Sequence, residues 1–158
     1  MIIRRFKPTD ADAVVRVSEL ATRITSGAVY DQAFVEEMVA KQTRDYFLRR
    51  GEQMHFYVAC EDDAVIGCAA IGPYHKNPAE SCLYSVFVLP EKQKRGVGRA
   101  LIAAIEQDPW FLQASRVVIP ASINALQFYR NLGYTFAAGG DQLDEEQLYC
   151  LEKFPQQR

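Results

Sequence analysis

The segment of residues 82–107 constrains the fold more than any other part of the chain. Apolar residues typical of a buried strand lead to Pro90, and a basic, glycine-containing turn then opens an amphipathic helix. The turn reads QKRGVGR, residues 93–99. Amide groups that open a helix have no partner within it, and with the positive helix end they attract phosphate oxygens. The sequence therefore predicts a strand–turn–helix unit that binds a phosphorylated cofactor.

Other interpretations of this turn fit less well. A Walker A loop would need a Gly-Lys-Ser/Thr ending, which the turn lacks. A dinucleotide-binding fold would need a third glycine, where Leu101 stands, within repeated βαβ units. The structural alternative is an exposed basic turn before an ordinary surface helix. Four nearby cations favour phosphate binding instead: Lys92, Lys94, Arg95 and Arg99.

Composition limits what kind of protein this can be. We expect residues 1–158 to form a single domain, which is long enough to bury its own core. The formal net charge of -2 argues against a nucleic-acid partner, which needs a broad basic surface. No apolar run is long enough for a bilayer and no secretory signal is recognised, so we expect a cytoplasmic protein without a membrane partner.

No metal is expected as a cofactor. The four cysteines show no CxxC spacing, and neither of the two histidines stands at ligand spacing with a cysteine. Three of the cysteines fall in apolar, strand-like segments, where a free thiol behaves as a small hydrophobic group.

Hydrophobic periodicity and turn residues predict a mixed α/β chain. A first helix is expected to have Thr9 as N-cap, and a second one Asp31; residues 46–48 either continue the second helix or begin another turn, and Gly51 ends it. A third helix starts at Gly98 and ends at residues 108–109. The remaining expected elements are strands over 2–6, 54–60, 64–71, 81–89, 116–119, 134–138 and 147–154, a loop over 72–78 and a helix over 124–132.

Two motifs resemble the GNAT superfamily of N-acetyltransferases. The pattern Gln93-x-x-Gly96-x-Gly98, after the strand YSVFVLP, is similar to the acetyl-CoA motif of that family. Residues 121–134, ASINALQFYRNLGY, resemble its later helix with the signature N-A-x-x-F-Y-x-x-x-G-[FY]. Two motifs in the right order are more specific than either alone, and the resemblance extends over residues 54–136.

The resemblance implies a mixed, mostly antiparallel twisted sheet of six to seven strands with about four helices. The strands that end near Leu89 and Ile119 would form a parallel pair that splays apart at the centre, and the pantetheine arm of acetyl-CoA would lie in the gap. The cofactor-binding residues implied by the resemblance are Phe87, Val88, Gln93, Lys94, Arg95, Gly96, Val97, Gly98, Arg99, Asn124, Phe128 and Tyr129.

The implied activity is transfer of an acetyl group from acetyl-CoA to a primary amine, by direct attack in a ternary complex. The backbone N–H of Val88 would donate to the developing oxyanion. The hydroxyl of Tyr129 would protonate the leaving thiolate as general acid. Tyr129 could instead be an ordinary core aromatic residue.

The general base is less well defined. Many relatives carry a glutamate early in the strand before the turn, but Cys82 stands at that place. Glu80 lies on the same face of the strand and could act through a water, or it could be a loop charge. His75 and Tyr84 are further candidates. The missing glutamate supports an alternative function, a CoA-binding sensor or degenerate transferase without turnover.

The resemblance places the acceptor pocket between the first two helices and the loops 72–81 and 139–147. Side chains that could line this pocket are Tyr30, Phe34, Tyr46 and Tyr74. A small-molecule amine is the expected partner, while an amino acid, an antibiotic and a protein lysine remain open. A homodimer is also left open. A third hypothesis is a non-enzymatic domain whose basic turn contacts an acidic partner.

Overall fold

The computed structural model describes residues 1–75 and 77–155. The chain divides into two compact units. Unit 1 consists of residues 1–70 and 85–105, and unit 2 consists of residues 71–84 and the chain from residue 106 onward. Within the described part of the chain, no helix is long and apolar enough to cross a membrane.

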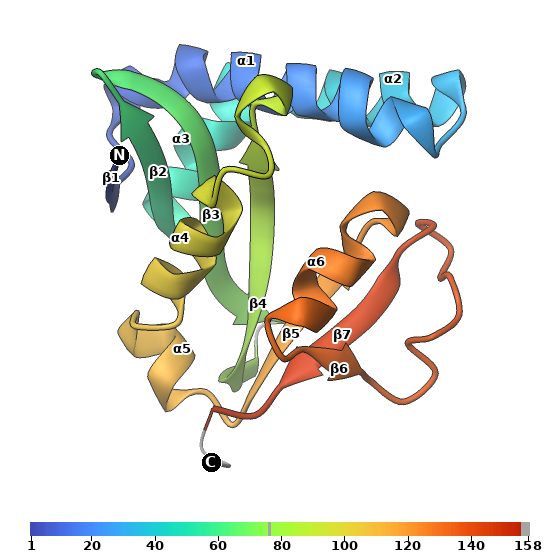
Figure 1. Ribbon diagram of the computed structural model, residues 1–158. Helices are drawn as coiled ribbons and strands as arrows, with labels where there is room; N and C mark the ends of the chain where they lie inside the picture. The colour runs from blue at the N-terminus through green and yellow to red at the C-terminus, as the bar shows by residue number, and fades with distance from the viewer. Residues whose placement is uncertain (76, 156–158) are drawn as a thin grey trace. The chain divides into compact units, whose positions relative to one another are not determined.

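Backbone hydrogen bonds join seven strands in the order β1-β2-β3-β4-β5-β7-β6 (Figure 1). β4 pairs with β5 in parallel, whereas β1·β2, β5·β7 and β6·β7 are antiparallel. This confirms the predicted mixed, mostly antiparallel sheet with a parallel pair. The strands are β1 Ile2–Arg5, β2 His55–Glu61, β3 Ala64–Tyr74, β4 Asn77–Val88, β5 Arg116–Ala121, β6 Thr135–Phe136 and β7 Tyr149–Lys153.

Six α-helices are found among the described residues, and two of them, α3 and α5, were not separated by the sequence analysis. Thr43 begins α3 by accepting a hydrogen bond from the amide of Tyr46 at 3.2 Å. Asp108 begins α5 by accepting a hydrogen bond from the amide of Trp110, although the sequence analysis predicted only the end of a helix at this residue. The helices are α1 Ala11–Leu20, α2 Gln32–Lys41, α3 Arg44–Gln53, α4 Val97–Ile105, α5 Pro109–Gln113 and α6 Leu126–Asn131.

Three local predictions are wrong. Gly51 lies inside α3 instead of ending a helix, and the lack of a side chain there leaves room for the ring of Phe6, which would lie 2.6 Å from a Cβ. The predicted loop over residues 72–78 belongs mostly to β3 and β4. The prolines of this stretch are exposed, and a strand tolerates proline where the missing backbone N–H is not needed for pairing. Lys76 of that loop lies outside the described residues. Thr9 is not an N-cap, since the helical turn before α1 already starts at Pro8.

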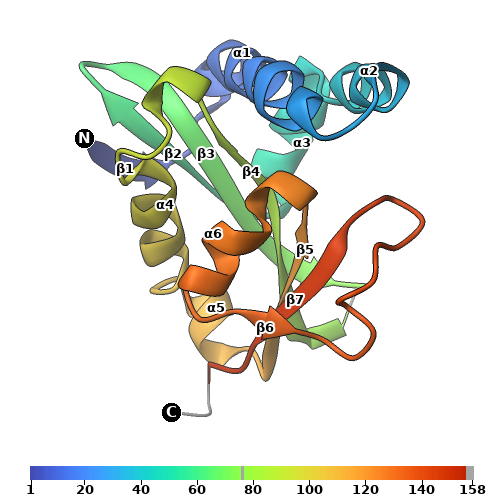
Figure 2. The same cartoon turned by 45° about the vertical axis from the view of Figure 1, so that its right-hand side comes forward.

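In unit 1, helices cover both faces of the strands. Phe47 of α3 stacks on Phe56 of β2 with ring centroids 6.1 Å apart. On the other face α4 crosses β3 closely, because a Cβ at Gly67 would lie 3.1 Å from a methyl carbon of Leu101. Figures 1 and 2 show α3 and α4 on opposite sides of these strands. The glycine in β3 thus sets how closely α4 approaches the strand.

In unit 2, the parallel ladder is short. The register runs from Glu80 opposite Arg116 to Cys82 opposite Val118. β5 then pairs with β7 over its length, and α6 lies over these two strands (Figures 1 and 2). The buried apolar residues of the unit include Ile71, Leu83, Phe111, Ile119, Tyr129, Tyr134 and Leu151.

Asp10 is the anchor that replaces the predicted Thr9 cap, and its loss should destabilise the protein. Its carboxylate accepts hydrogen bonds from Arg4 Nη1 and Nη2 at 2.8 and 2.9 Å and from the Lys7 amide at 2.8 Å. Hydrogen bonds to a buried charge support an expected loss of about 2 kcal/mol in unfolding free energy for Asp10→Ala. Urea unfolding at neutral pH measures this loss.

Acid should remove this contribution. The Arg4 guanidinium lowers the pKa of Asp10, so the carboxylate stabilises the fold above its ordinary pKa, and this is lost as pH falls through the lowered value. The difference between wild type and Asp10→Ala should therefore shrink in acid. Asp12→Ala is the matched control, because the Asp12 side chain is 81% exposed and pairs only at the surface with Arg44. Equal losses in both variants would contradict the anchoring role.

Candidate functional site

The turn between β4 and α4 in unit 1 has the backbone geometry of an anion site. Lys94 and Gly96 have positive φ angles, 62° and 85°, whereas Arg95 between them is not among the residues with positive φ. When successive residues alternate between right-handed and left-handed backbone conformations, their amide N–H groups point to one side and form a concavity that binds anions. The ladder of α4 begins with the Ala100 amide donating to the Gly96 carbonyl at 3.0 Å. The amides of residues 97–99 therefore stand ahead of the ladder.

Gln93 braces this turn. Its side-chain nitrogen donates to the carbonyl of Val88 at 3.1 Å and to Thr25 Oγ1 at 2.9 Å. The bonds tie the turn to the end of β4 and to the π-helical turn Ala21–Thr25 that follows α1. The sequence named Gln93 as a cofactor contact, and the structure shows that its side chain fixes the turn itself.

The charges around the turn are not all equivalent. Lys92 forms an ion pair with Glu61 at 2.7 Å and lowers the pKa of that carboxyl. Lys94, Arg95 and Arg99 are exposed, and no ion pair is found for them within the described part of the chain. Three of the four cations named from the sequence are thus placed to attract an anion.

β4 contains a backbone irregularity before the turn. Ser85 has a φ of 52°, which a non-glycine residue rarely adopts within a strand. The buried thiol of Cys68 donates to the Ser85 carbonyl at 3.3 Å, and burial raises the pKa of this thiol to about 12. Beyond this point Phe87 and Val88 are only half-buried although they are apolar. The strand therefore presents partly open apolar residues next to the basic turn.

Tyr129, the predicted acid, lies in α6 of unit 2. Only 5% of it is exposed, and its ring packs edge-on against Phe128 and Tyr134 at centroid distances of 5.1 and 6.2 Å. Burial raises the pKa of its hydroxyl above the ordinary value. No hydrogen bond of this hydroxyl is found among residues 1–75 and 77–155. Asn124 precedes α6 in a short 3-10 turn and is exposed, and Phe128 is half-buried.

Glu80 is neither a loop charge nor an isolated base candidate. It lies in β4, and its carboxylate accepts hydrogen bonds from Arg116 Nε and Nη2 at 2.6 and 3.3 Å. Arg116 also donates to Glu152 of β7 at 3.2 Å, so one guanidinium links three strands. Cys82, which the family resemblance suggested as the position of a glutamate base, is buried.

The predicted acceptor-pocket residues are placed in different units. In unit 1, Tyr30 and Phe34 stack with centroids 4.6 Å apart at the start of α2, where Asp31 caps the helix as predicted. In unit 2, the ring of Tyr74 lies 5.7 Å from the guanidinium carbon of Arg116. Tyr30 and Phe34 therefore contact one another, and their role in binding an acceptor stays a prediction.

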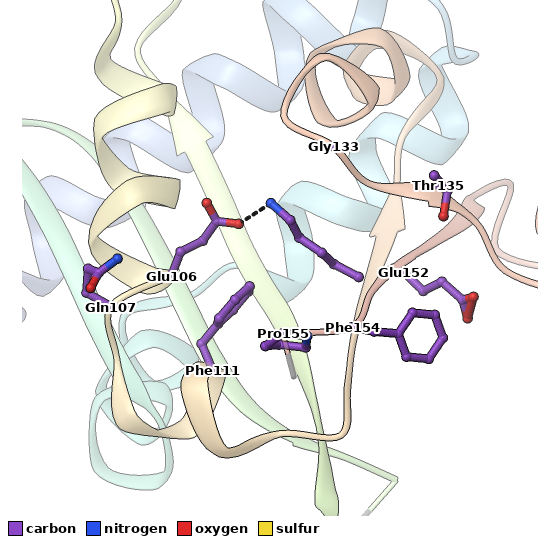
Figure 3. Close-up of a pocket in the computed structure, with 9 residues that line it drawn as sticks. Glu106, Gln107, Phe111, Gly133, Thr135, Glu152, Phe154 and Pro155 are labelled. Carbon is purple, nitrogen blue, oxygen red and sulfur yellow. Dashed lines mark hydrogen bonds and ion pairs between the residues drawn. The ribbon is translucent and has the colours of Figure 1, made fainter. Parts of the chain in front are cut away.

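The sequence analysis missed a hollow of about 430 Å³ in unit 2 (Figure 3). In the sequence, its lining residues Glu106 and Gln107 come directly after α4, whereas the basic turn comes before that helix. No group of metal-ligating side chains is found here or elsewhere among the described residues. The hollow is lined by Glu106, Gln107, Phe111, Gly133, Thr135, Glu152, Lys153, Phe154 and Pro155.

Comparison with known proteins shows the family. The family model described as acetyltransferase (GNAT) domain matches residues 52–136, more than half of the chain. The chain belongs to the GNAT acetyltransferase family. The match contains both motifs from which the resemblance was inferred, and the GNAT assignment made from the sequence is confirmed.

Relatives and solved structures of GNAT proteins are similar to this chain. An uncharacterized N-acetyltransferase of Bacillus subtilis, YuaI, is 26% identical over 103 residues, which are 64% of this chain and only 60% of that relative. The PaiA N-acetyltransferase of Thermoplasma acidophilum, solved with coenzyme A, is similar in structure with a TM-score of 0.81 and 16% sequence identity. The similar region covers 97% of this chain and 98% of the PaiA chain. A GNAT acetyltransferase of Brucella melitensis, solved with acetyl-CoA, has a TM-score of 0.63 and 25% sequence identity, and the similar region covers 95% of this chain and 86% of that one.

Proposed function

We propose that the two units form one GNAT domain that transfers an acetyl group from acetyl-CoA to a primary amine. The observation that carries this proposal is the turn of residues 93–96, whose alternating backbone hands and exposed cations suit a diphosphate. The motif match over residues 52–136 and the solved relatives with coenzyme A or acetyl-CoA support the same cofactor.

The residues of the turn fit the cofactor by chemistry and by space. A Cβ at Gly96 would meet nothing within 4 Å, so the backbone there is open to a ligand. Lys94, Arg95 and Arg99 would neutralise its phosphates, and the amides of residues 97–99 would donate to the oxygens. Asn124 and Phe128 would contact the pantetheine arm. Bound acetyl-CoA would supply an activated thioester.

Two groups of the chain would then assist the transfer. The amide of Val88 would donate to the oxygen that gains charge when the amine attacks. Tyr129 would donate its hydroxyl proton to the departing sulfur. Because burial raises its pKa, Tyr129 stays protonated, and so remains a donor, to higher pH than an exposed tyrosine.

We propose that Glu80 serves chiefly to hold Arg116. Its carboxylate already accepts two hydrogen bonds from that guanidinium, and a base so engaged must break them to accept a proton. The acceptor amine would instead lose its proton to solvent before it attacks. A small molecule is the proposed acceptor, with Tyr30, Phe34 and Tyr74 as its apolar contacts.

The second candidate function is a CoA-binding sensor without turnover. The observation that favours it is Cys82, a buried thiol at the position where many relatives carry a glutamate base. A sensor would keep the phosphate-binding turn and lose the need for Tyr129 and an acceptor.

Thiol release from acetyl-CoA, measured with a panel of amines, tests the proposed function. We expect turnover with at least one small primary amine and none with acetyl-CoA alone. Calorimetry with CoA provides the second measurement. Binding without turnover on any amine, peptide lysine included, would favour the sensor. No binding at millimolar CoA would overturn both functions and would favour a domain whose basic turn contacts an acidic partner.

A further inference from the structure

A polar network connects the hollow of unit 2 to the aromatic residues beside Tyr129. The hydroxyl of Tyr134 donates to the Glu106 carboxylate at 3.1 Å. The ammonium of Lys153 donates to the same carboxylate at 2.6 Å, and both residues line the hollow; a dashed line from Glu106 marks this ion pair in Figure 3. The Lys153 ammonium also lies 4.7 Å from the centroid of the Tyr134 ring. One carboxylate and one ammonium thus hold the buried Tyr134 by its hydroxyl and by its face.

Lys153 also holds the end of α6. Its ammonium donates to the carbonyl of Leu132 at 2.9 Å. Carbonyl groups at the C-terminal end of a helix have no amide partner within the helix. Gly133 turns the chain there with a φ of 94°, and a Cβ at this position would lie 3.6 Å from the Lys153 nitrogen. A cation at a helix C-terminus stabilises it. Lys153 therefore fixes the last turn of α6 from outside the helix.

Tyr129 depends on both parts of this arrangement. Its carbonyl accepts the amides of Leu132 and Tyr134 at 3.0 and 3.2 Å, and its ring rests edge-on against the Tyr134 ring. The Tyr129 side chain therefore takes its position from the ring and the helix end that Lys153 and Glu106 hold.

The ion pair is half-buried, which makes its geometry matter. The side chains of Lys153 and Glu106 are 30% and 24% exposed. Removing one member of such a pair leaves the other charge poorly solvated and without its partner, which destabilises the local arrangement. Tyr134 contacts both members of the pair, since its hydroxyl donates to Glu106 and its ring faces the Lys153 ammonium.

We propose that Lys153 and Glu106 are positioning residues for Tyr129. They act through Tyr134 and the end of α6 and touch neither cofactor nor acceptor. This inference rests on the proposed function for its effect on turnover, while its effect on the Tyr129 ring does not depend on turnover.

The kinetic test compares Lys153→Met, Lys153→Arg and the control Arg130→Met. Arg130 lies in α6 beside Tyr129, and its guanidinium carbon lies 5.0 Å from the centroid of the Phe136 ring, outside the network of Lys153 and Glu106. We expect Lys153→Met to lower kcat by about tenfold with the KM for acetyl-CoA nearly unchanged. Lys153→Arg should restore most of kcat, and Arg130→Met should leave it unchanged.

A double variant separates positioning from general damage. If Lys153 acts through Tyr129, adding Lys153→Met to Tyr129→Phe should cost nothing more, because the group that it positions is already gone. Multiplied losses in the double variant would overturn the proposal. An unchanged kcat in Lys153→Met would overturn it as well.

NMR of the intact protein with labelled tyrosine rings tests the inference independently of activity. The signal of Tyr129, assigned by its absence in Tyr129→Phe, should shift or broaden in Lys153→Met and stay in place in Arg130→Met. An unmoved signal overturns the inference even if the enzyme is active. A moved signal in a protein without turnover supports the positioning while the proposed function fails.

Discussion

Gly96→Val is expected to raise the KM for acetyl-CoA by about 100-fold while the protein remains folded. Gly96 has a φ of 85°, a region that β-branched residues avoid, so valine would force the turn into another shape. The amides ahead of α4 would then no longer point to one side. Because nothing lies within 4 Å of a Cβ at this position, the substitution adds strain without a clash. Steady-state kinetics and calorimetry with CoA measure the loss.

Gly139→Val is the matched control for this variant. Gly139 also has a positive φ, 72°, and a Cβ there also meets nothing within 4 Å, but it lies in the loop before β7. Both variants should lose similar unfolding free energy, about 1–3 kcal/mol for a residue held at positive φ. Only Gly96→Val should lose affinity for CoA. An unchanged CoA affinity in Gly96→Val would remove the turn from the cofactor site.

The sequence was informative where chemistry is local. Residues 93–99 predicted the turn because glycines and basic residues stand together directly before an amphipathic helix. Asp31 was recognised as a cap because its partner, Phe34, is three residues away. The helix that carries Tyr129 was found from its own motif.

Contacts between distant parts of the chain could not be predicted in this way. Gly51 was expected to end a helix, but it lies inside α3, where its missing side chain makes room for the ring of Phe6. Glu80 had no visible partner because Arg116 is 36 residues away. The pairing of Glu106 with Lys153 spans 47 residues and follows no short motif. Each of these outcomes depends on tertiary packing, which a single sequence does not encode as a local pattern.

Tyr129→Phe is expected to lower kcat by about 100-fold, or about 2.7 kcal/mol in the barrier, with the affinity for CoA nearly unchanged. The substitution keeps the ring that packs against Phe128 and Tyr134 and removes only the hydroxyl. Stability should therefore change little. Single-turnover thiol release measures the chemical step, and calorimetry measures the binding of CoA.

Tyr149→Phe provides the control for loss of a tyrosine hydroxyl in the same unit, since its half-buried ring packs against Phe136. Its kcat should match that of wild type. The pH profile adds an independent check on Tyr129. Because burial raises the pKa of Tyr129, the protonated, donating form persists as pH rises, and wild-type kcat should not fall up to about pH 10. If kcat is unchanged in Tyr129→Phe, solvent protonates the thiolate and Tyr129 is only a core aromatic residue.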